Sequence, residues 1–133
     1  MKKIPLPIMI LGWILSAFGV FAFLSCFSII GNPAAIIDGF NFAADNASHA
    51  AAWMIGGRSL GQAILMIIGL LSNNRKILSA GFAMRAVTEL GDVVAGAVYG
   101  VSPLPMLVML GIFIALEATS AYWLGFRLMD EQK

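Results

Sequence analysis

Five charged side chains lie inside stretches of sequence that are otherwise apolar. An ionised group at the centre of a bilayer costs at least about 2.5–3.5 kcal/mol, so such groups are expected to turn away from lipid and to pair. Carboxyl groups held beside guanidinium groups in a dry interior can move protons to and from a bound molecule, which is general acid/base chemistry. The five residues are Arg58, Arg85, Glu89, Asp92 and Glu117.

The spacing of the polar residues in the third apolar stretch places them on one helical face. At about 100° per residue, they fall within roughly 100° of arc, while Val87, Leu90 and Val94 lie on the opposite side. In the second stretch, Arg58 and Gln62 are one turn apart and share a face. The polar face of the third stretch holds Arg85, Thr88, Glu89, Asp92 and Tyr99.

Depth along the helices predicts which charges meet. At about 1.5 Å per residue, Arg58 and Asp92 both lie roughly 10–12 Å from the outer ends of their helices, and Arg85 and Glu117 both lie at roughly 20 Å. We therefore predict an outer pair, Arg58 with Asp92, and an inner pair, Arg85 with Glu117. Glu89 lies four residues after Arg85 and is expected to share its guanidinium. Because desolvation and neighbouring carboxylates favour a protonated carboxyl, one acid is expected to carry a proton near neutral pH.

Three uses of this charged interior stay open. In the first, a small lipophilic molecule binds there and is transformed by acid/base chemistry, which needs no cofactor. In the second, the charges only lock the bundle of a non-catalytic accessory or assembly subunit. Transport of a small solute or proton is less favoured, because four short helices make a thin path. The candidate acid/base residues are Glu89, Asp92 and Glu117, and the candidate ligand-binding residues are Arg58, Gln62, Arg85, Thr88 and Tyr99.

Four apolar stretches must position these residues. A helix needs about 20 apolar residues to cross a bilayer core, and the stretches run over about 8–30, 50–71, 77–99 and 104–126. The 133 residues are 60% hydrophobic and 11% charged, so the excess apolar surface is expected to face lipid. The predicted fold is all-α, a single polytopic membrane domain over 1–133 that forms an antiparallel four-helix bundle. A short amphipathic segment over 33–46 is expected at the outer interface.

The basic residues predict the orientation of this bundle. The basic residues outside the apolar stretches lie before the first stretch, between the second and the third, or after the fourth. In a bundle of four spans, these three places lie on the same side of the membrane. By the positive-inside rule, both termini are then cytoplasmic. The residues are Lys2, Lys3, Arg75, Lys76, Arg127 and Lys133.

Other features of the sequence narrow the function. A net charge of +1 without a basic arm gives no reason to expect a nucleic-acid partner. Cys26 is the single cysteine, so no internal disulfide is possible, and His49 has no second nitrogen or thiolate ligand nearby, so no metal site is expected. Two glycine pairs, Gly57 with Gly61 and Gly96 with Gly100, are expected to support packing within the chain more than contact between copies, although a homo-oligomer through these glycine faces stays open.

Four short motifs follow one another in recognisable order over roughly 32–94. They are Asn32-Pro33, Gly56-Gly57-Arg58-Ser59-Leu60-Gly61, Asn73-Asn74-Arg75-Lys76 and Asp92. In these motifs the chain resembles the DoxX-like group of small four-helix bacterial membrane proteins, many of which are classed as domains of unknown function. The resemblance implies a multi-pass protein of the bacterial inner membrane. Related domains often carry Arg-Asp where this chain has Arg58-Ser59, so that acid is missing here.

Overall fold

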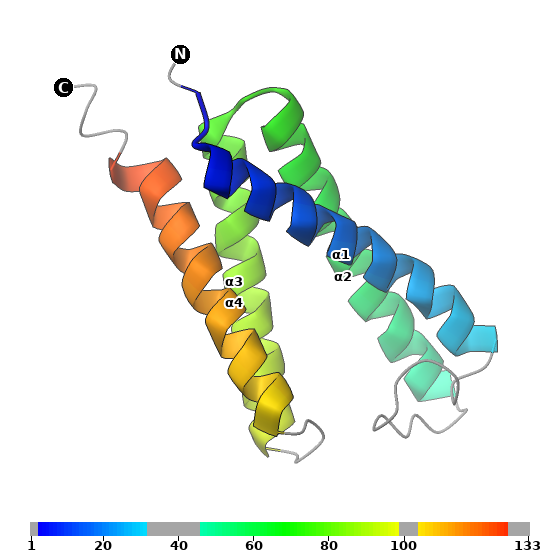
Figure 1. Cartoon of the computed structure of the whole chain (residues 1–133). Coiled ribbons are helices and arrows are strands. Elements are labelled where there is room, and N and C mark those ends of the chain that lie inside the picture. The colour runs from blue at the N-terminus through cyan, green and yellow to red at the C-terminus, as the bar shows by residue number, and fades with distance from the viewer. Residues whose placement is uncertain (1–2, 32–45, 99–103, 128–133) are drawn as a thin grey trace.

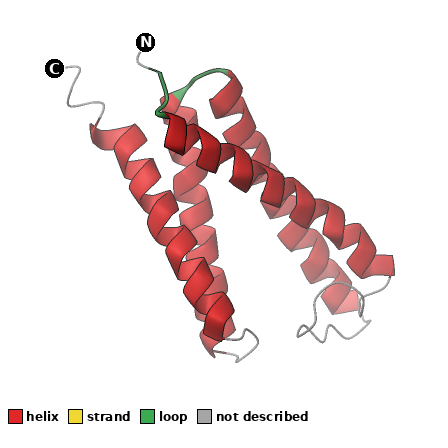
Figure 2. Cartoon of the chain, viewed as in Figure 1, coloured by secondary structure: helices red, strands yellow, loops and turns green. Residues whose placement is uncertain are grey.

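The computed structural model describes residues 3–31, 46–98 and 104–127. In these ranges the chain forms four α-helices and no strand, which confirms the predicted all-α class (Figure 2). The expected interfacial segment 33–46 lies outside the described residues, except for Asn46, which begins a helix. Tyr99 also lies outside the described residues. The helices are α1 (Leu6–Gly31), α2 (Asn46–Leu71), α3 (Arg75–Val98) and α4 (Leu104–Tyr122), and a π-helical turn, η2 (Trp123–Arg127), continues α4.

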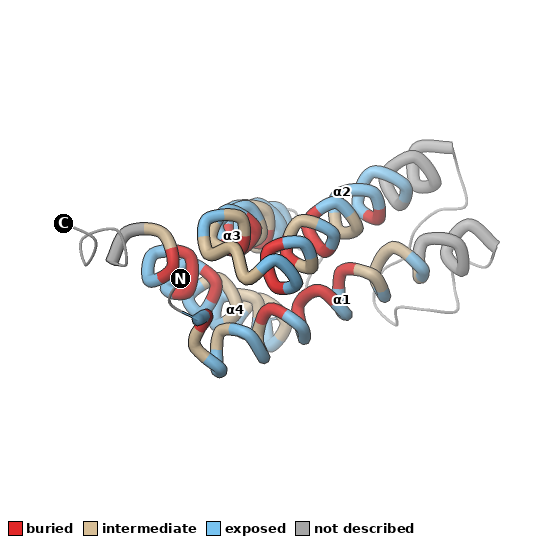
Figure 3. The backbone as a smooth tube through the Cα atoms, turned by 90° about the horizontal axis from the view of Figure 1, so that it is seen from above, coloured by how far each residue is buried: buried red, intermediate tan, exposed pale blue. Residues whose placement is uncertain are grey.

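The helices are arranged as two pairs that diverge from a common end. In Figure 1, α1 lies along α2 and α3 lies along α4, and a short turn joins α2 to α3. The start of α1, this turn and the end of η2 lie at the same end of the molecule, which we call the turn end. At the other end, the open end, the two pairs are further apart. Seen from above, the buried residues gather where the helices face one another (Figure 3).

The turn between α2 and α3 is built by two asparagines. Asn73 has a φ of 49°, a left-handed conformation that asparagine adopts more readily than most residues. The Asn74 side-chain oxygen accepts hydrogen bonds from the backbone N–H groups of Lys76 and Ile77, at 3.1 and 3.2 Å, and so caps the start of α3. These local bonds fix where α3 leaves α2.

The segment before α1 is fastened to the same turn. The Ile4 N–H donates to the Asn73 side-chain oxygen at 3.3 Å, and the Arg75 guanidinium donates to the Lys3 carbonyl oxygen. Ile4 is itself buried in the apolar core. The entry to α1 and the start of α3 are thus held at one end of the structure.

The apolar core occupies the half of the bundle nearest the turn end. Close packing of these apolar side chains gains van der Waals contacts between the helices. Further along the helices, toward the open end, the facing side chains become polar. The core consists of Ile4, Leu15, Met66, Leu70, Leu78, Phe82, Ala121 and Leu124.

The outside of the bundle is apolar, and three helices are long and apolar enough to cross a membrane. These segments are Leu6–Ser25, Trp53–Leu71 and Leu104–Gly125, judged by length and composition. The sequence predicts four spans, and α3 does not meet the same standard because Arg85, Glu89 and Asp92 interrupt its apolar run. Its outward side chains are nevertheless apolar: Val87, Leu90 and Val94 are all exposed.

At two glycines the backbone of another helix approaches closely, and they are not the glycines that the sequence singles out. A Cβ on Gly19 of α1 would lie 2.7 Å from the Ser59 carbonyl oxygen of α2, and one on Gly69 would lie 2.8 Å from the Leu78 nitrogen of α3. At Gly57 and Gly61 a Cβ would meet none of the described residues within 4 Å. The expectation that Gly57 and Gly61 serve packing within the chain is therefore wrong, because this face of α2 is turned away from α1 and α3. Gly96 is buried, and Gly100 lies outside the described residues.

Candidate functional site

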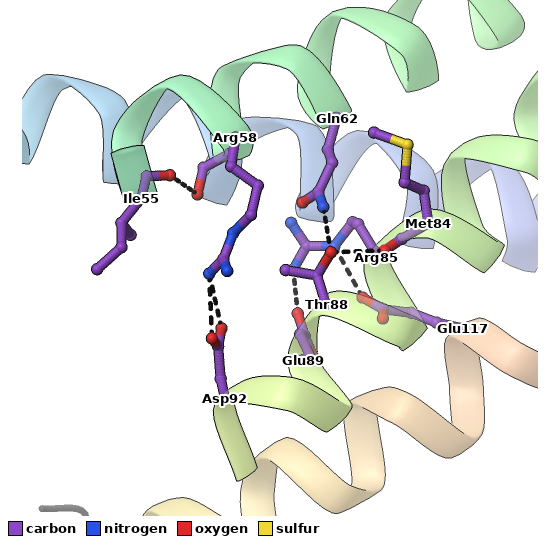
Figure 4. A network of polar contacts seen from close by, with 10 residues as sticks. Ile55, Arg58, Gln62, Met84, Arg85, Thr88, Glu89, Asp92 and Glu117 are labelled. Atoms are coloured by element: carbon purple, nitrogen blue, oxygen red, sulfur yellow. Dashed lines mark hydrogen bonds and ion pairs between the residues drawn. The ribbon is translucent and has the colours of Figure 1, made fainter. Parts of the chain in front are cut away.

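Arg85 of α3 lies at the centre of a buried ionic cluster (Figure 4). Its Nε donates to Glu117 Oε1 of α4 at 2.8 Å, and its Nη2 donates to Glu89 Oε1, one turn further along α3. The side chains of Arg85 and Glu89 are each 11% exposed, and that of Glu117 is fully buried. One guanidinium thus holds two acids from two helices, and we call these three residues the Arg85 cluster.

Each acid of the Arg85 cluster has an oxygen that is not hydrogen-bonded. Glu89 Oε2 and Glu117 Oε2 are buried and have no hydrogen-bond partner among the residues that the structure describes. A buried carboxylate oxygen without a partner is costly, because water cannot replace the missing bond. The two atoms are therefore places where a proton or a donor group of a ligand can bind.

A second ion pair lies toward the open end. Arg58 of α2 donates from Nη2 to both carboxylate oxygens of Asp92 on α3, at 2.9 and 3.1 Å. These side chains are 38% and 46% exposed, so the pair is far more accessible than the Arg85 cluster. Both bonds use one nitrogen, and within the described ranges Nε and Nη1 of Arg58 bind no other side chain. An arginine has five N–H donors, so this one can still bind an oxygen of another molecule.

An uncharged contact lies between the two ionic groups. Gln62 Nε2 of α2 donates to Thr88 Oγ1 of α3 at 2.8 Å, and the Thr88 hydroxyl donates in turn to the Met84 carbonyl oxygen at 2.7 Å. Gln62 is buried. The sequence places both residues on the polar faces of their helices but does not predict that they bind each other.

The polar residues form a series in which exposure falls with depth. Arg58 and Asp92 are about two-fifths exposed, Arg85 and Glu89 about one-tenth, and Glu117 not at all. Figure 4 shows this series running from the Arg58–Asp92 pair, past Gln62 and Thr88, to Glu117. A molecule that reaches the Arg58–Asp92 pair could therefore contact further polar groups at each more deeply buried position.

The structure confirms the predicted contacts between charged residues. Arg58 pairs with Asp92, Arg85 pairs with Glu117, and Glu89 shares the Arg85 guanidinium. The catalytic and ligand-binding roles assigned to these residues stay predictions. In the described ranges, no group of three or more His, Cys, Asp or Glu side chains could hold a metal ion.

Two surface hollows lie away from these charges. One, of about 480 Å³, is a shallow groove on the apolar face of α3, lined by Val87, Leu90, Gly91, Val94, Ala95 and Val98. The other, of about 240 Å³, lies near the turn end, between the segment that begins α1 and the end of α4, and includes Pro7, Thr119 and Trp123. Neither is bordered by Arg58 or Arg85.

Comparisons of this chain with protein-family models, with curated proteins and with solved structures find no match.

Proposed function

We propose that this chain is a four-span membrane protein in which α3 is a span despite its charges. In support, the charged side chains of α3 pair with one another or with α2 and α4, and its opposite face is apolar and exposed. Pairing removes the main cost of placing ionised groups at membrane depth. The basic residues at the turn end, Lys3, Arg75 and Lys76, support a cytoplasmic position for that end. The resemblance to the DoxX-like group supports the inner membrane of a bacterium.

The proposed function is the binding of a small lipophilic molecule with a polar oxygen group, followed by acid/base chemistry on it. The observation that carries this proposal is the fall in exposure along the series, from the accessible Arg58–Asp92 pair to the buried Glu117. A site built only for packing has no need of an accessible end. The apolar part of the ligand would lie among the lipid-facing helices, and its oxygen would bind free N–H groups of Arg58.

Each polar residue has a role in this proposal. Arg58 and Gln62 orient the ligand oxygen, together with the Thr88 hydroxyl. Glu89 and Asp92 are the carboxyls nearest to the accessible end and act as the acid/base pair. Arg85 and Glu117 lie deeper and act on the ligand through Glu89, so they are positioning residues here. The substrate class is that of amphiphilic alcohols and acids, such as isoprenoid-like molecules.

Equilibrium binding tests this proposal directly. The purified protein in lipid nanodiscs is titrated with radiolabelled farnesol and, separately, with farnesoic acid, and compared with empty nanodiscs. We expect saturable binding of one probe, weakened at least tenfold by Arg58→Leu. Lys76→Leu is the matched control, because it removes one positive charge at the exposed turn end and should leave binding unchanged. Binding that equals lipid partition, or that is the same in both variants, contradicts the proposal.

The second candidate function is that of an accessory or assembly subunit. It is favoured by one observation, the open glycine face of α2 at Gly57 and Gly61, where a second helix could pack closely. The partner would be a second copy of this chain or another membrane protein. Gly61→Leu distinguishes the two functions: it should abolish assembly on this face and leave ligand binding intact.

A further inference from the structure

The Arg85 cluster has a feature that ion pairing alone does not explain. The carboxyls of Glu89 and Glu117 each bind the Arg85 guanidinium with one oxygen, and the other oxygen of each is buried without a hydrogen-bond partner among the described residues. Two ionised carboxylates have no hydrogen to donate. A proton on one of the two acids makes one of these oxygens a donor and removes one of the two negative charges beside a single cation.

The charges around the cluster do not supply a second cation. Arg58, the only arginine on α2, is paired with Asp92. Asp92 itself adds a third acid on the polar face of α3 that carries Glu89. Neither α1 nor the rest of α4 contributes a charged residue to the interior. The Arg85 cluster is therefore one positive and two negative groups in a largely buried space, where two fully ionised carboxyls repel each other.

We propose that Glu89 and Glu117 bind one proton between them, so that the Arg85 cluster is a proton-binding site with no net charge. The two unpaired oxygens, Glu89 Oε2 and Glu117 Oε2, are the atoms to which this proton can bind. The inference deepens the proposed function, since it identifies the stored proton that an acid step on the ligand would use. In that step the O–H bond of Glu89 breaks, the proton forms a bond to the ligand, and the cluster is left with one negative charge until a proton returns.

Infrared spectroscopy of the ligand-free protein in nanodiscs tests this inference. A protonated carboxylic acid has a carbonyl stretch that an ionised one lacks, and this band shifts in D₂O. At neutral pH we expect such a band in the wild type. It should be lost in Glu89→Gln and also in Glu117→Gln, because the remaining acid then faces Arg85 alone and ionises. Asp92→Asn is the matched control: it removes an acid of the same helix, outside the cluster, and should keep the band.

Three results would overturn the shared proton. They are a wild-type spectrum identical to that of the Glu89→Gln/Glu117→Gln double variant, a band that survives in either single variant, and a band lost in Asp92→Asn. If Glu117→Gln does not fold, the comparison of Glu89→Gln with Asp92→Asn still decides between a proton in the cluster and none. Because no ligand is present, this experiment can fail while the farnesol titration succeeds, and the reverse also holds.

Discussion

Arg85 Nε lies 2.8 Å from Glu117 Oε1 although 32 residues separate the two in the chain. This bond joins the side chains of α3 and α4 just beyond the apolar core, and the Ser79 hydroxyl joins the same helices by donating to the Ala121 carbonyl oxygen at 2.8 Å. The Arg85 side chain also binds Glu89. The positions of the two buried acids, Glu89 and Glu117, therefore depend on one guanidinium.

Arg85→Leu should be the most destabilising change among the charged residues. It leaves two buried carboxyls without their cation, and the loss of one partner of a buried pair costs about 3–5 kcal/mol. Arg58→Leu is the matched control, because it breaks an ion pair that is about two-fifths exposed and should therefore cost less. Reversible unfolding in mixed detergent micelles measures both free energies. A cost for Arg85→Leu no greater than that for Arg58→Leu contradicts the structural role of the cluster.

The hydrogen bond from Gln62 to Thr88 should contribute a small, measurable amount to stability. Interhelical side-chain bonds in membrane proteins are worth about 0.6 kcal/mol on average and at most about 1.7 kcal/mol. Thr88→Val removes the acceptor and leaves the buried Gln62 amide without it, so we expect a loss near the upper value. Thr119→Val is the control, because the Thr119 hydroxyl binds only its own helix, at the Ala115 carbonyl oxygen, and is exposed. Equal losses in the two variants mean that the contact with Gln62 adds nothing.

The ionic contacts could be predicted from the sequence because few partners exist. Each charge in an apolar stretch had to find an opposite charge at similar depth, and helical rise fixes depth. The Gln62–Thr88 bond had no such constraint, since a buried amide or hydroxyl can also bind its own backbone, as the Thr88 hydroxyl does.

Glycine spacing was a poor guide to the packing. Gly57 and Gly61 have the small-x-x-x-small pattern, yet the close approaches of one helix backbone to another occur at Gly19 and Gly69, and these depend on how whole helices cross. The sequence also could not show that the pairs diverge at the open end, because divergence follows from the sum of all contacts along each interface.

Gly19→Ala should weaken the packing of α1 on α2. The added methyl group would lie 2.7 Å from the Ser59 carbonyl oxygen, a backbone atom that cannot turn aside, and 2.9 Å from the Ala63 Cβ. Overpacking of this kind costs about 1–3 kcal/mol. Gly61→Ala is the control, since its methyl group meets nothing within 4 Å and should be neutral or slightly stabilising in unfolding measurements. If Gly61→Ala instead lowers the free energy of unfolding and also removes a crosslinked dimer band, this face of α2 packs against another copy of the chain.

Cysteine labelling from outside the cell should show that α3 crosses the membrane. Lys76 lies at the turn end, in the first turn of α3, whereas Leu104 begins α4 at the open end and is 73% exposed. Since Cys26 is the only cysteine, Cys26→Ser provides a background for Lys76→Cys and Leu104→Cys. A membrane-impermeant maleimide should label Leu104→Cys on intact cells and Lys76→Cys only after lysis. Labelling of both on intact cells, or of neither, would put the two ends of α3 on one side and exclude it as a span. The reverse pattern would keep α3 as a span and contradict the orientation that the basic residues indicate.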